Sequence, residues 1–156
     1  MGIAPNIQDF LAQEEITYDV VTHPRSMTSR QAAAGAHVPG ARVAKAVLLE
    51  DERGYLLAVL PATHVVEVGK LGRQLHRSLR LAAEAELPRL FRDCALGAVP
   101  AVGDSYGLPT VVESDLAVQP DIYFEAGDHE RLIHLSGGEF ARLMAHADVR
   151  HFSHRT

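Results

Sequence analysis

Apolar and polar residues alternate in short runs along the first third of the chain, and each run predicts a short element. The apolar residues within 7–11 have the i, i+3, i+4 spacing of a helix face. Residues 17–21 then have an extended pattern. Thr28 and Gln31 have the spacing of a capping box, which predicts a second helix that begins at Thr28 and ends near Gly35.

The segment 43–49 is apolar on both faces of a two-residue period, apart from Lys45. Strands that are buried on both faces have this pattern, so we expect a central strand. Residues 51–54 supply turn chemistry, and 55–60 return as an antiparallel partner that ends at Pro61.

The second half of the chain predicts more short elements than long ones. They are helices at 68–75 and 84–91 that cover the sheet, a glycine- and proline-rich loop at 97–109, strands at 110–113, 121–126 and 131–135, and a final helix that begins at the capping box of Ser136 and Glu139. Hairpins outnumber crossovers in this order, and no long-period repeat or low-complexity segment divides the chain. We therefore expect one α+β domain over residues 1–156, with a curled, mainly antiparallel, barrel-like sheet surrounded by helices.

Composition and charge restrict the setting. The 156 residues are 47% hydrophobic and 22% charged, which is ordinary for one globular domain. The single cysteine, Cys94, has no internal disulfide partner, and no run approaches the roughly 20 apolar residues of a membrane helix. The first residues do not resemble a signal peptide, so we expect a cytoplasmic protein with no membrane partner. A net charge of −5 argues against bulk electrostatic binding of DNA but allows a locally basic cleft.

Lys45 is the residue that most strongly indicates chemistry. An ammonium group is costly to bury without a partner, so a lysine within an apolar strand needs an explanation. Either it serves a functional site, or it lies at a barrel mouth or sheet edge and extends its charge to water. The 97–109 loop is a second candidate because glycines let the main chain approach a ligand, although such loops are usually simple connections.

The nine histidines do not have the spacing of a metal site. His129 and His134 are five residues apart, rather than the four of the zinc-protease helix motif, and they lie across a predicted turn and strand. The histidines within 146–154 lie in a polar segment, where we expect exposed side chains. Neither a P-loop nor a dinucleotide-binding fingerprint is present. We expect no metal and no organic cofactor.

Six stretches form a series whose order and spacing are more specific than any one of them. They are Tyr18 through Pro24 with Thr28, Val43–Leu48, Leu57–Pro61, Gly97–Gly103, Tyr106–Pro109 and Ala126–His129. Together they resemble the bacterial YbaK and prolyl-tRNA synthetase-associated editing domains, which hydrolyse mischarged aminoacyl-tRNA. The resemblance covers nearly the whole chain. It implies a distorted antiparallel sheet wrapped by helices, with the acceptor end of a tRNA entering a pocket beside the lysine strand.

The resemblance also implies roles for individual residues. Lys45 matches the essential lysine of the family, and the main chain of the Gly97 loop is expected to hold the ester and the attacking water. The residues expected to bind substrate are His23, Thr28, Ala46, Gly97, Pro100, Ala101, Gly103, Gly127 and His129. The implied partner is the acceptor end of an aminoacyl-tRNA, and an aminoacyl-tRNA synthetase is a further candidate.

Two departures from the family pattern keep other functions open. Ala46 stands where the family commonly has Thr, Ser or Asn, and Ala101-Val102 replace a second proline and an aromatic residue. The sequence therefore allows three hypotheses. The first is a free-standing deacylase for small amino acids on tRNA-Pro, the second a non-catalytic module that binds aminoacyl-tRNA or a synthetase, and the third an enzyme whose lysine forms a Schiff base.

Overall fold

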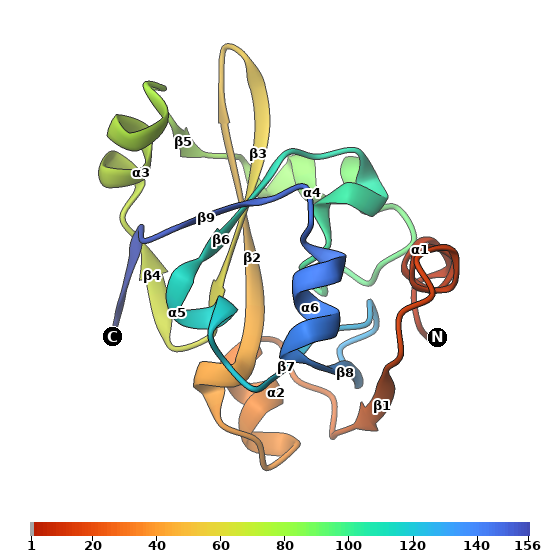
Figure 1. The fold of residues 1–156 in the computed structure, drawn as a ribbon. Helices are drawn as coiled ribbons and strands as arrows, with labels where there is room; N and C mark the ends of the chain where they lie inside the picture. Colours follow the sequence, from red (N-terminus) through yellow and green to blue (C-terminus); the bar gives the residue numbers. More distant parts are fainter. Residues whose placement is uncertain (1) are drawn as a thin grey trace.

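A long antiparallel hairpin lies at the centre of the molecule, which is described by a computed structural model over residues 2–156. Its two strands are β2 (Val43–Asp51) and β3 (Gly54–Pro61), and its turn projects beyond the other elements (Figure 1). Gly54 closes the turn with φ +124°, a value that side chains disfavour. The predicted central strand and its return strand are both confirmed.

The hairpin belongs to an eight-stranded mixed sheet. The strand order is β1-β8-β7-β2-β3-β6-β9, with β5 also paired to β2, and β10 pairs with β4 in a separate ladder. The β2–β7, β3–β6 and β6–β9 pairs are parallel, and the other pairs are antiparallel. The remaining strands are β1 (Asp19–Thr22), β4 (His64–Val66), β5 (Arg80–Leu81), β6 (Thr110–Glu113), β7 (Asp121–Glu125), β8 (Arg131–Ser136), β9 (Asp148–Arg150) and β10 (Ser153–Arg155).

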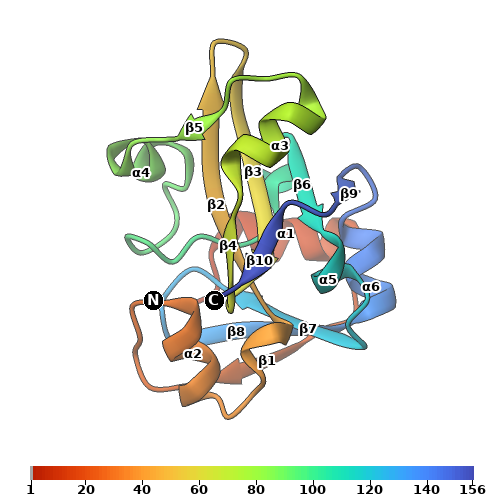
Figure 2. The same cartoon turned by 90° about the vertical axis from the view of Figure 1, so that its left-hand side faces the viewer.

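The sheet is curled but does not close. Strands β7, β8 and β1 cross below the hairpin at a large angle instead of continuing beside it (Figure 2). Because β1 and β9 remain at the two ends of the order, the sheet keeps two free edges. The arrangement confirms the expected α+β class with a curled sheet surrounded by helices.

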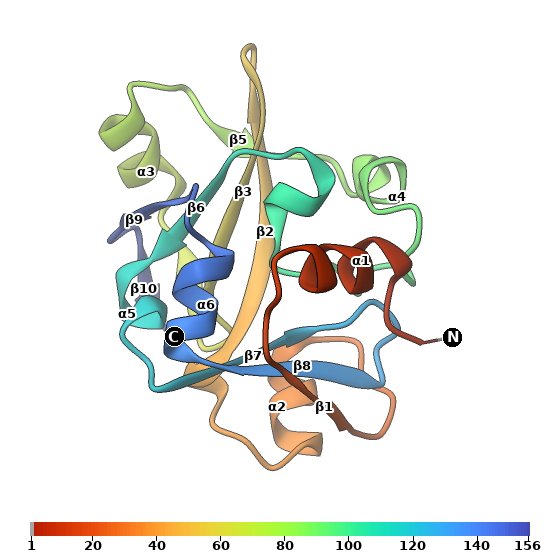
Figure 3. The ribbon, with the colours of Figure 1, turned by 45° about the vertical axis from the view of Figure 1, so that its right-hand side comes forward.

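Helices cover both faces of this sheet. They are α1 (Pro5–Gln13), α2 (Ser29–Gly35), α3 (Val68–Leu75), α4 (Leu87–Leu90), α5 (Ser114–Ala117) and α6 (Gly137–Leu143), with 3-10 turns at Gly40–Arg42, Glu84–Glu86 and Gly103–Tyr106. The main core forms where α1, α5 and α6 pack on one face, and α3 covers a second cluster behind the hairpin. Helices α1 and α2 lie on opposite sides of β7 and β8 (Figure 3). No helix within residues 2–156 is long and apolar enough to cross a membrane.

The capping boxes predicted both helix starts correctly. Thr28 Oγ1 accepts a hydrogen bond from the main-chain N–H of Gln31 at 3.1 Å, and Ser136 caps α6 in the same way through Glu139. The helix expected over 84–91 is instead a 3-10 turn followed by α4. Pro88, near the start of α4, has no N–H to donate, so it cannot continue a helix that began before it.

Several short elements were missed, namely β4, β5, α5, β9 and β10. The largest omission is the C-terminal segment, in which β10 pairs with β4 and Phe152 is fully buried. The side chains of His146, His151 and His154 are 80%, 54% and 59% exposed, as expected for a polar segment. Strands of two or three residues carry too little period-2 pattern to be read from sequence.

Candidate functional site

Lys45 is half-buried in β2, between Val43 and Val47 on the same face of the strand. Its ammonium group has no hydrogen bond or ion pair with any other group in residues 2–156. Burial lowers the pKa of Lys45, and the positive charge of Arg30 on α2 lowers it further. The charge is therefore available to a ligand instead of being neutralised within the protein.

Glu125 and Lys45 both come directly after the point where the β2–β7 pairing ends. The last register pair is Ala44 with Phe124, so Lys45 and Glu125 are the next residue of each strand. Paired residues of parallel strands have side chains on the same face, and the face alternates at each residue. Lys45 and Glu125 therefore leave their strands on a common face, the one on which α2 packs through Ala33.

The carboxyl group of Glu125 is buried and incompletely paired. Burial raises its pKa to about 7, although the charge of His23 and hydrogen bonds from the main-chain N–H groups of His129 and Gly127 act in the opposite direction. Its Oε2 atom has no hydrogen-bond partner among residues 2–156. Buried polar atoms without partners are uncommon in folded proteins, and perturbed pKa values concentrate at functional sites.

The β7–β8 turn after Glu125 has an unusual main chain. Gly127 has φ +121°, and His129 has φ +65°, a left-handed conformation that is uncommon for residues other than glycine. The Nε2 atom of His129 donates a hydrogen bond to the carbonyl oxygen of Leu96 at 2.6 Å. This bond joins the turn to the start of the Gly97 loop, so the structure brings two of the predicted site segments together.

The segment from His23 to Ser26 runs beside the same turn. The main-chain N–H of His23 donates to the carbonyl oxygen of Glu130 at 2.9 Å, and that of Ser26 donates to His129 at 3.1 Å. The side chains of both residues are buried, and neither His23 Nε2 nor Ser26 Oγ has a partner within residues 2–156. His23 was predicted as a site residue and Ser26 was not.

Gly97 lies close to His129 in the β7–β8 turn. It has φ +82°, and a Cβ atom at this position would lie 3.7 Å from His129 Cε1. A cavity of about 170 Å³ lies beside the loop. It is lined by Leu87, Pro88, Phe91, Arg92, Cys94, Ala95, Leu96, Gly97 and Val99. The loop therefore borders a small cavity on the side of α4.

The other predicted site residues lie elsewhere. Thr28 is the exposed N-cap of α2, and Ala46 lies on the opposite face of β2 from Lys45, packed against the main core. Pro100 and Ala101 are buried. Gly103 is packed so closely that a Cβ atom there would lie 2.8 Å from the carbonyl oxygen of Leu108. These last three residues shape the loop from inside the protein.

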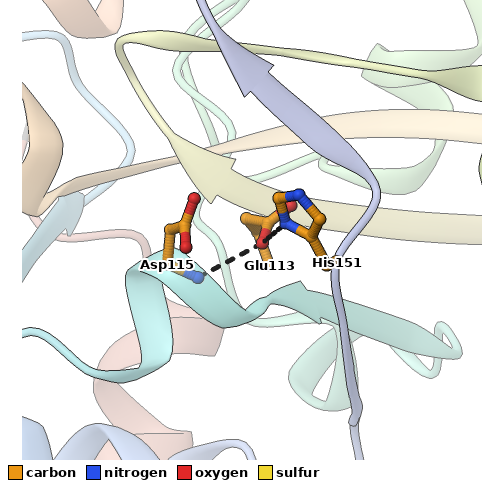
Figure 4. A group of neighbouring side chains, drawn as sticks. All are labelled: Glu113, Asp115 and His151. Atoms are coloured by element: carbon orange, nitrogen blue, oxygen red, sulfur yellow. Dashed lines mark hydrogen bonds and ion pairs between the residues drawn. The ribbon is translucent and has the colours of Figure 1, made fainter.

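A second polar cluster joins Glu113 to Asp115 and His151 (Figure 4). Their potential ligand atoms lie within 4.8 Å of one another, as a metal site requires. The Glu113 oxygens, however, accept hydrogen bonds from His151 Nδ1, from Ser114 Oγ and Ser153 Oγ, and from the main-chain N–H groups of Asp115, Phe152 and Ser153. Six donors already surround this carboxylate. The cluster therefore fits a structural clamp on the C-terminal segment better than a cation site.

Two further candidates, the Cys94 thiol and the pair of His129 and His134, have no catalytic geometry. Burial raises the pKa of the Cys94 thiol to about 12, which disfavours the nucleophilic thiolate. His134 stacks on Tyr123 with ring centroids 4.3 Å apart, and its Nε2 bonds to Asp121 at 2.7 Å, whereas His129 bonds to Leu96. The two histidines thus have separate partners.

Comparison with known families decides the classification. The sequence profile of the aminoacyl-tRNA editing domain matches residues 23–143, which is more than half of the chain. The chain belongs to the family of aminoacyl-tRNA editing domains. The matched residues of this editing domain include Lys45, Glu125 and the turn that follows β7.

Solved structures share the fold over almost the full length of the editing domain. One, a proposed trans-editing enzyme for prolyl-tRNA synthetase, has a TM-score of 0.83 at 25% identity, covering 97% of this chain and 96% of its own. A hypothetical protein has a TM-score of 0.84 at 20% identity, with 96% and 99% covered. A proposed signal transduction protein from Marinobacter aquaeolei has a TM-score of 0.76 at 22% identity, and the similarity spans 95% of this chain but 30% of that one. A search of curated proteins gave no match.

Sequence reasoning missed Glu125 and Ser26. Glu125 follows the apolar residues Ile122–Phe124 at the end of a predicted strand, so it carried the same signal that singled out Lys45, a charge in an apolar strand. Ser26 carried no signal, because an isolated serine in a loop is ordinary. Its burial depends on the contact with the β7–β8 turn.

Proposed function

We propose that this editing domain is a free-standing deacylase that hydrolyses the ester bond of mischarged aminoacyl-tRNA. The observation that supports this most is the unpaired ammonium group of Lys45 in a member of the editing family, on the same face of the sheet as the buried carboxyl group of Glu125. Small amino acids on tRNA-Pro are the first substrates to test, because one structural neighbour is described as a trans-editing enzyme for prolyl-tRNA synthetase.

The reaction needs no strong nucleophile, because an ester is already activated. The oxygen of water bonds to the ester carbonyl carbon, and the bond from that carbon to the ribose oxygen breaks, which releases the amino acid and a tRNA with a free hydroxyl group. The ammonium group of Lys45 would stabilise the negative charge that develops on the carbonyl oxygen. Main-chain groups near Gly97 would position the ester and the water.

The test is single-turnover deacylation on a panel of mischarged tRNAs, with Lys45→Ala and Lys45→Arg beside the wild type. Loss of one well-placed electrostatic contact typically lowers a reaction rate by a factor on the order of 10²–10³. The deacylation rate of Lys45→Ala should therefore be lower than that of the wild type by this factor. Lys45→Arg should recover part of the rate, because a planar guanidinium keeps the charge but not its position. Lys70 is the only other lysine, and Lys70→Ala on α3 should match the wild type.

The same proteins separate the alternatives. Tight binding of aminoacyl-tRNA without turnover of any panel member would support a non-catalytic binding module. Borohydride trapping of a carbonyl substrate on Lys45 would support a Schiff-base enzyme, for which the lowered pKa of Lys45 is suitable. An unchanged rate in Lys45→Ala, with an unchanged melting temperature, would remove Lys45 from the site. A synthetase partner and a cytoplasmic location are part of the same proposal.

A further inference from the structure

Three buried polar atoms beside the β7–β8 turn have no partner in residues 2–156. They are Glu125 Oε2, His23 Nε2 and Ser26 Oγ. The three residues are 8%, 7% and 8% exposed. A buried polar atom without a hydrogen bond is costly, and these three atoms belong to residues whose main chains meet at one turn.

The main chain holds these residues around the same four-residue turn. The N–H groups of Gly127 and His129 point at the Glu125 carboxyl group, and the carbonyl oxygens of His129 and Glu130 hold the main chain of residues 23–26. Asp128, in the same turn, is occupied by an ion pair with Arg131. The turn therefore fixes both sides of the site without using its three unpartnered atoms.

The hydrogen bonding of His23 determines what its open nitrogen can do. Its Nδ1 atom lies 2.8 Å from the carbonyl oxygen of Pro24. A carbonyl oxygen only accepts hydrogen bonds, so Nδ1 must carry the hydrogen, and in the neutral ring Nε2 presents a lone pair. The site thus offers a carboxylate oxygen, a serine oxygen that can also accept and, when the His23 ring is neutral, an imidazole nitrogen that accepts.

A primary ammonium group has three N–H donors and no acceptor, so it matches these three acceptors. A phosphate or carboxylate would instead face the Glu125 carboxylate and be repelled. An aminoacyl ester carries such an ammonium group on the carbon next to its ester carbonyl. Glu125 and Lys45 each come one register position beyond the last β2–β7 pair and leave their strands on the same face, so both face the same side of the sheet.

We propose that Glu125, with His23 and Ser26, binds the α-ammonium group of the aminoacyl ester and makes the domain selective for substrates with a free amino group. This inference rests on the proposed deacylase function. An N-acylated ester, the chemical class of peptidyl-tRNA, has an uncharged and larger group at that position. It would leave the Glu125 carboxylate without a cation, so the domain should reject it.

The experiment compares one mischarged tRNA with the same tRNA after acetylation of its α-amino group. Single-turnover deacylation is measured at pH 7.5 for the wild type, Glu125→Gln, Ser26→Ala and the control Glu130→Gln, and melting temperatures verify folding. Glu130 is exposed in the same turn, so its variant tests a general loss of charge. Spontaneous hydrolysis of each ester is subtracted, because acetylation itself changes ester reactivity.

The wild type and Glu130→Gln should cleave the free-amine ester faster by on the order of 10- to 100-fold, the usual effect of one charge-assisted hydrogen bond. Glu125→Gln should lose that preference by slowing on the free-amine ester alone, and Ser26→Ala should lose part of it. Equal wild-type rates on both esters would overturn the inference and leave the deacylase intact. Equal slowing of both esters by Glu125→Gln would also overturn it, because Glu125 would then act in a shared step. No wild-type turnover of any ester would instead contradict the proposed function.

Discussion

Glu113 and Glu125 each end a strand of the same sheet, β6 and β7, and both side chains are buried, but their surroundings have opposite effects. Burial alone would raise the pKa of Glu113, but hydrogen bonds from His151, Ser153 and the main chain outweigh it and hold the pKa at about 2. For Glu125, burial prevails and the pKa rises to about 7. Burial of a charge therefore does not identify a site. The unsatisfied atoms do, because a completed network leaves nothing for a ligand to bind.

The largest expected difference between the two glutamates is in stability. Glu113→Gln places an amide N–H₂ where main-chain and serine donors already converge, so it should lower the free energy of unfolding by about 2–3 kcal/mol. The melting temperature should then fall by roughly 5–10 °C, given ~2–4 °C per kcal/mol at this size. Glu125→Gln should hold or raise the melting temperature at pH 8, because it removes a poorly compensated buried charge. Equal losses of melting temperature in both variants would show that the two carboxyl groups do not differ in their contribution to stability.

The contributions of the same two residues to stability should change with pH in opposite directions. Glu113 has a folded pKa of about 2, below the ordinary 4.5, so its contribution is present above pH 4.5 and is lost as the pH falls towards 2. Glu125 has a folded pKa of about 7, so its contribution is present below pH 4.5 and is lost as the pH rises to 7.

Urea unfolding of the wild type and the two glutamine variants between pH 2.5 and pH 8 measures this directly. The deficit of Glu113→Gln relative to the wild type should shrink on acidification. The stability of Glu125→Gln relative to the wild type should rise between pH 4.5 and pH 7. Parallel curves for all three proteins would show that neither carboxyl group has the environment described.

Salt should have a smaller effect, because few cations lie near Lys45 in this acidic chain. Arg25 and Arg30 are exposed beside the site, and the guanidinium of Arg30 also binds the carbonyl oxygens of residues 62 and 63. Each phosphate contact with a single strand contributes about 0.7 to the slope of log affinity against log salt, so a slope near roughly −2 is expected for tRNA. Arg30→Gln should reduce it by about 0.7, and Arg89→Gln on α4 should not. A slope steeper than about −5 would reveal a basic surface elsewhere.

Chelation should have the smallest effect. Deacylation in excess EDTA should change by less than about twofold, because the proposed chemistry uses Lys45 and needs no Lewis acid. The Glu113 carboxylate, the centre of the candidate metal group, is already surrounded by six donors. Activity that EDTA removes, that zinc restores and that Asp115→Asn abolishes would instead make the Glu113 cluster a metal centre.

Much of the local structure could be read from sequence. The capping residues Thr28 and Ser136 and the turn at 51–54 were predicted correctly, because their signals depend on neighbours within a few residues. The short strands β4, β9 and β10 could not be predicted. They exist because distant segments pair with them, as when Ser153 pairs with Val66.

The amino-acid pattern alone shows that one charged residue, Lys45, stands in the apolar run 43–49, and the fold class follows from patterns of the same kind. Contacts between distant segments determine which buried acidic residue keeps an unpaired oxygen. Glu113 and Glu125 look alike in sequence, because each ends a short apolar strand. They differ because the C-terminal segment supplies donors to one, whereas the turn after β7 and the His23 segment leave the other with an open acceptor. Hydrogen-bond satisfaction depends on groups that are far apart in the chain, so no local pattern encodes it.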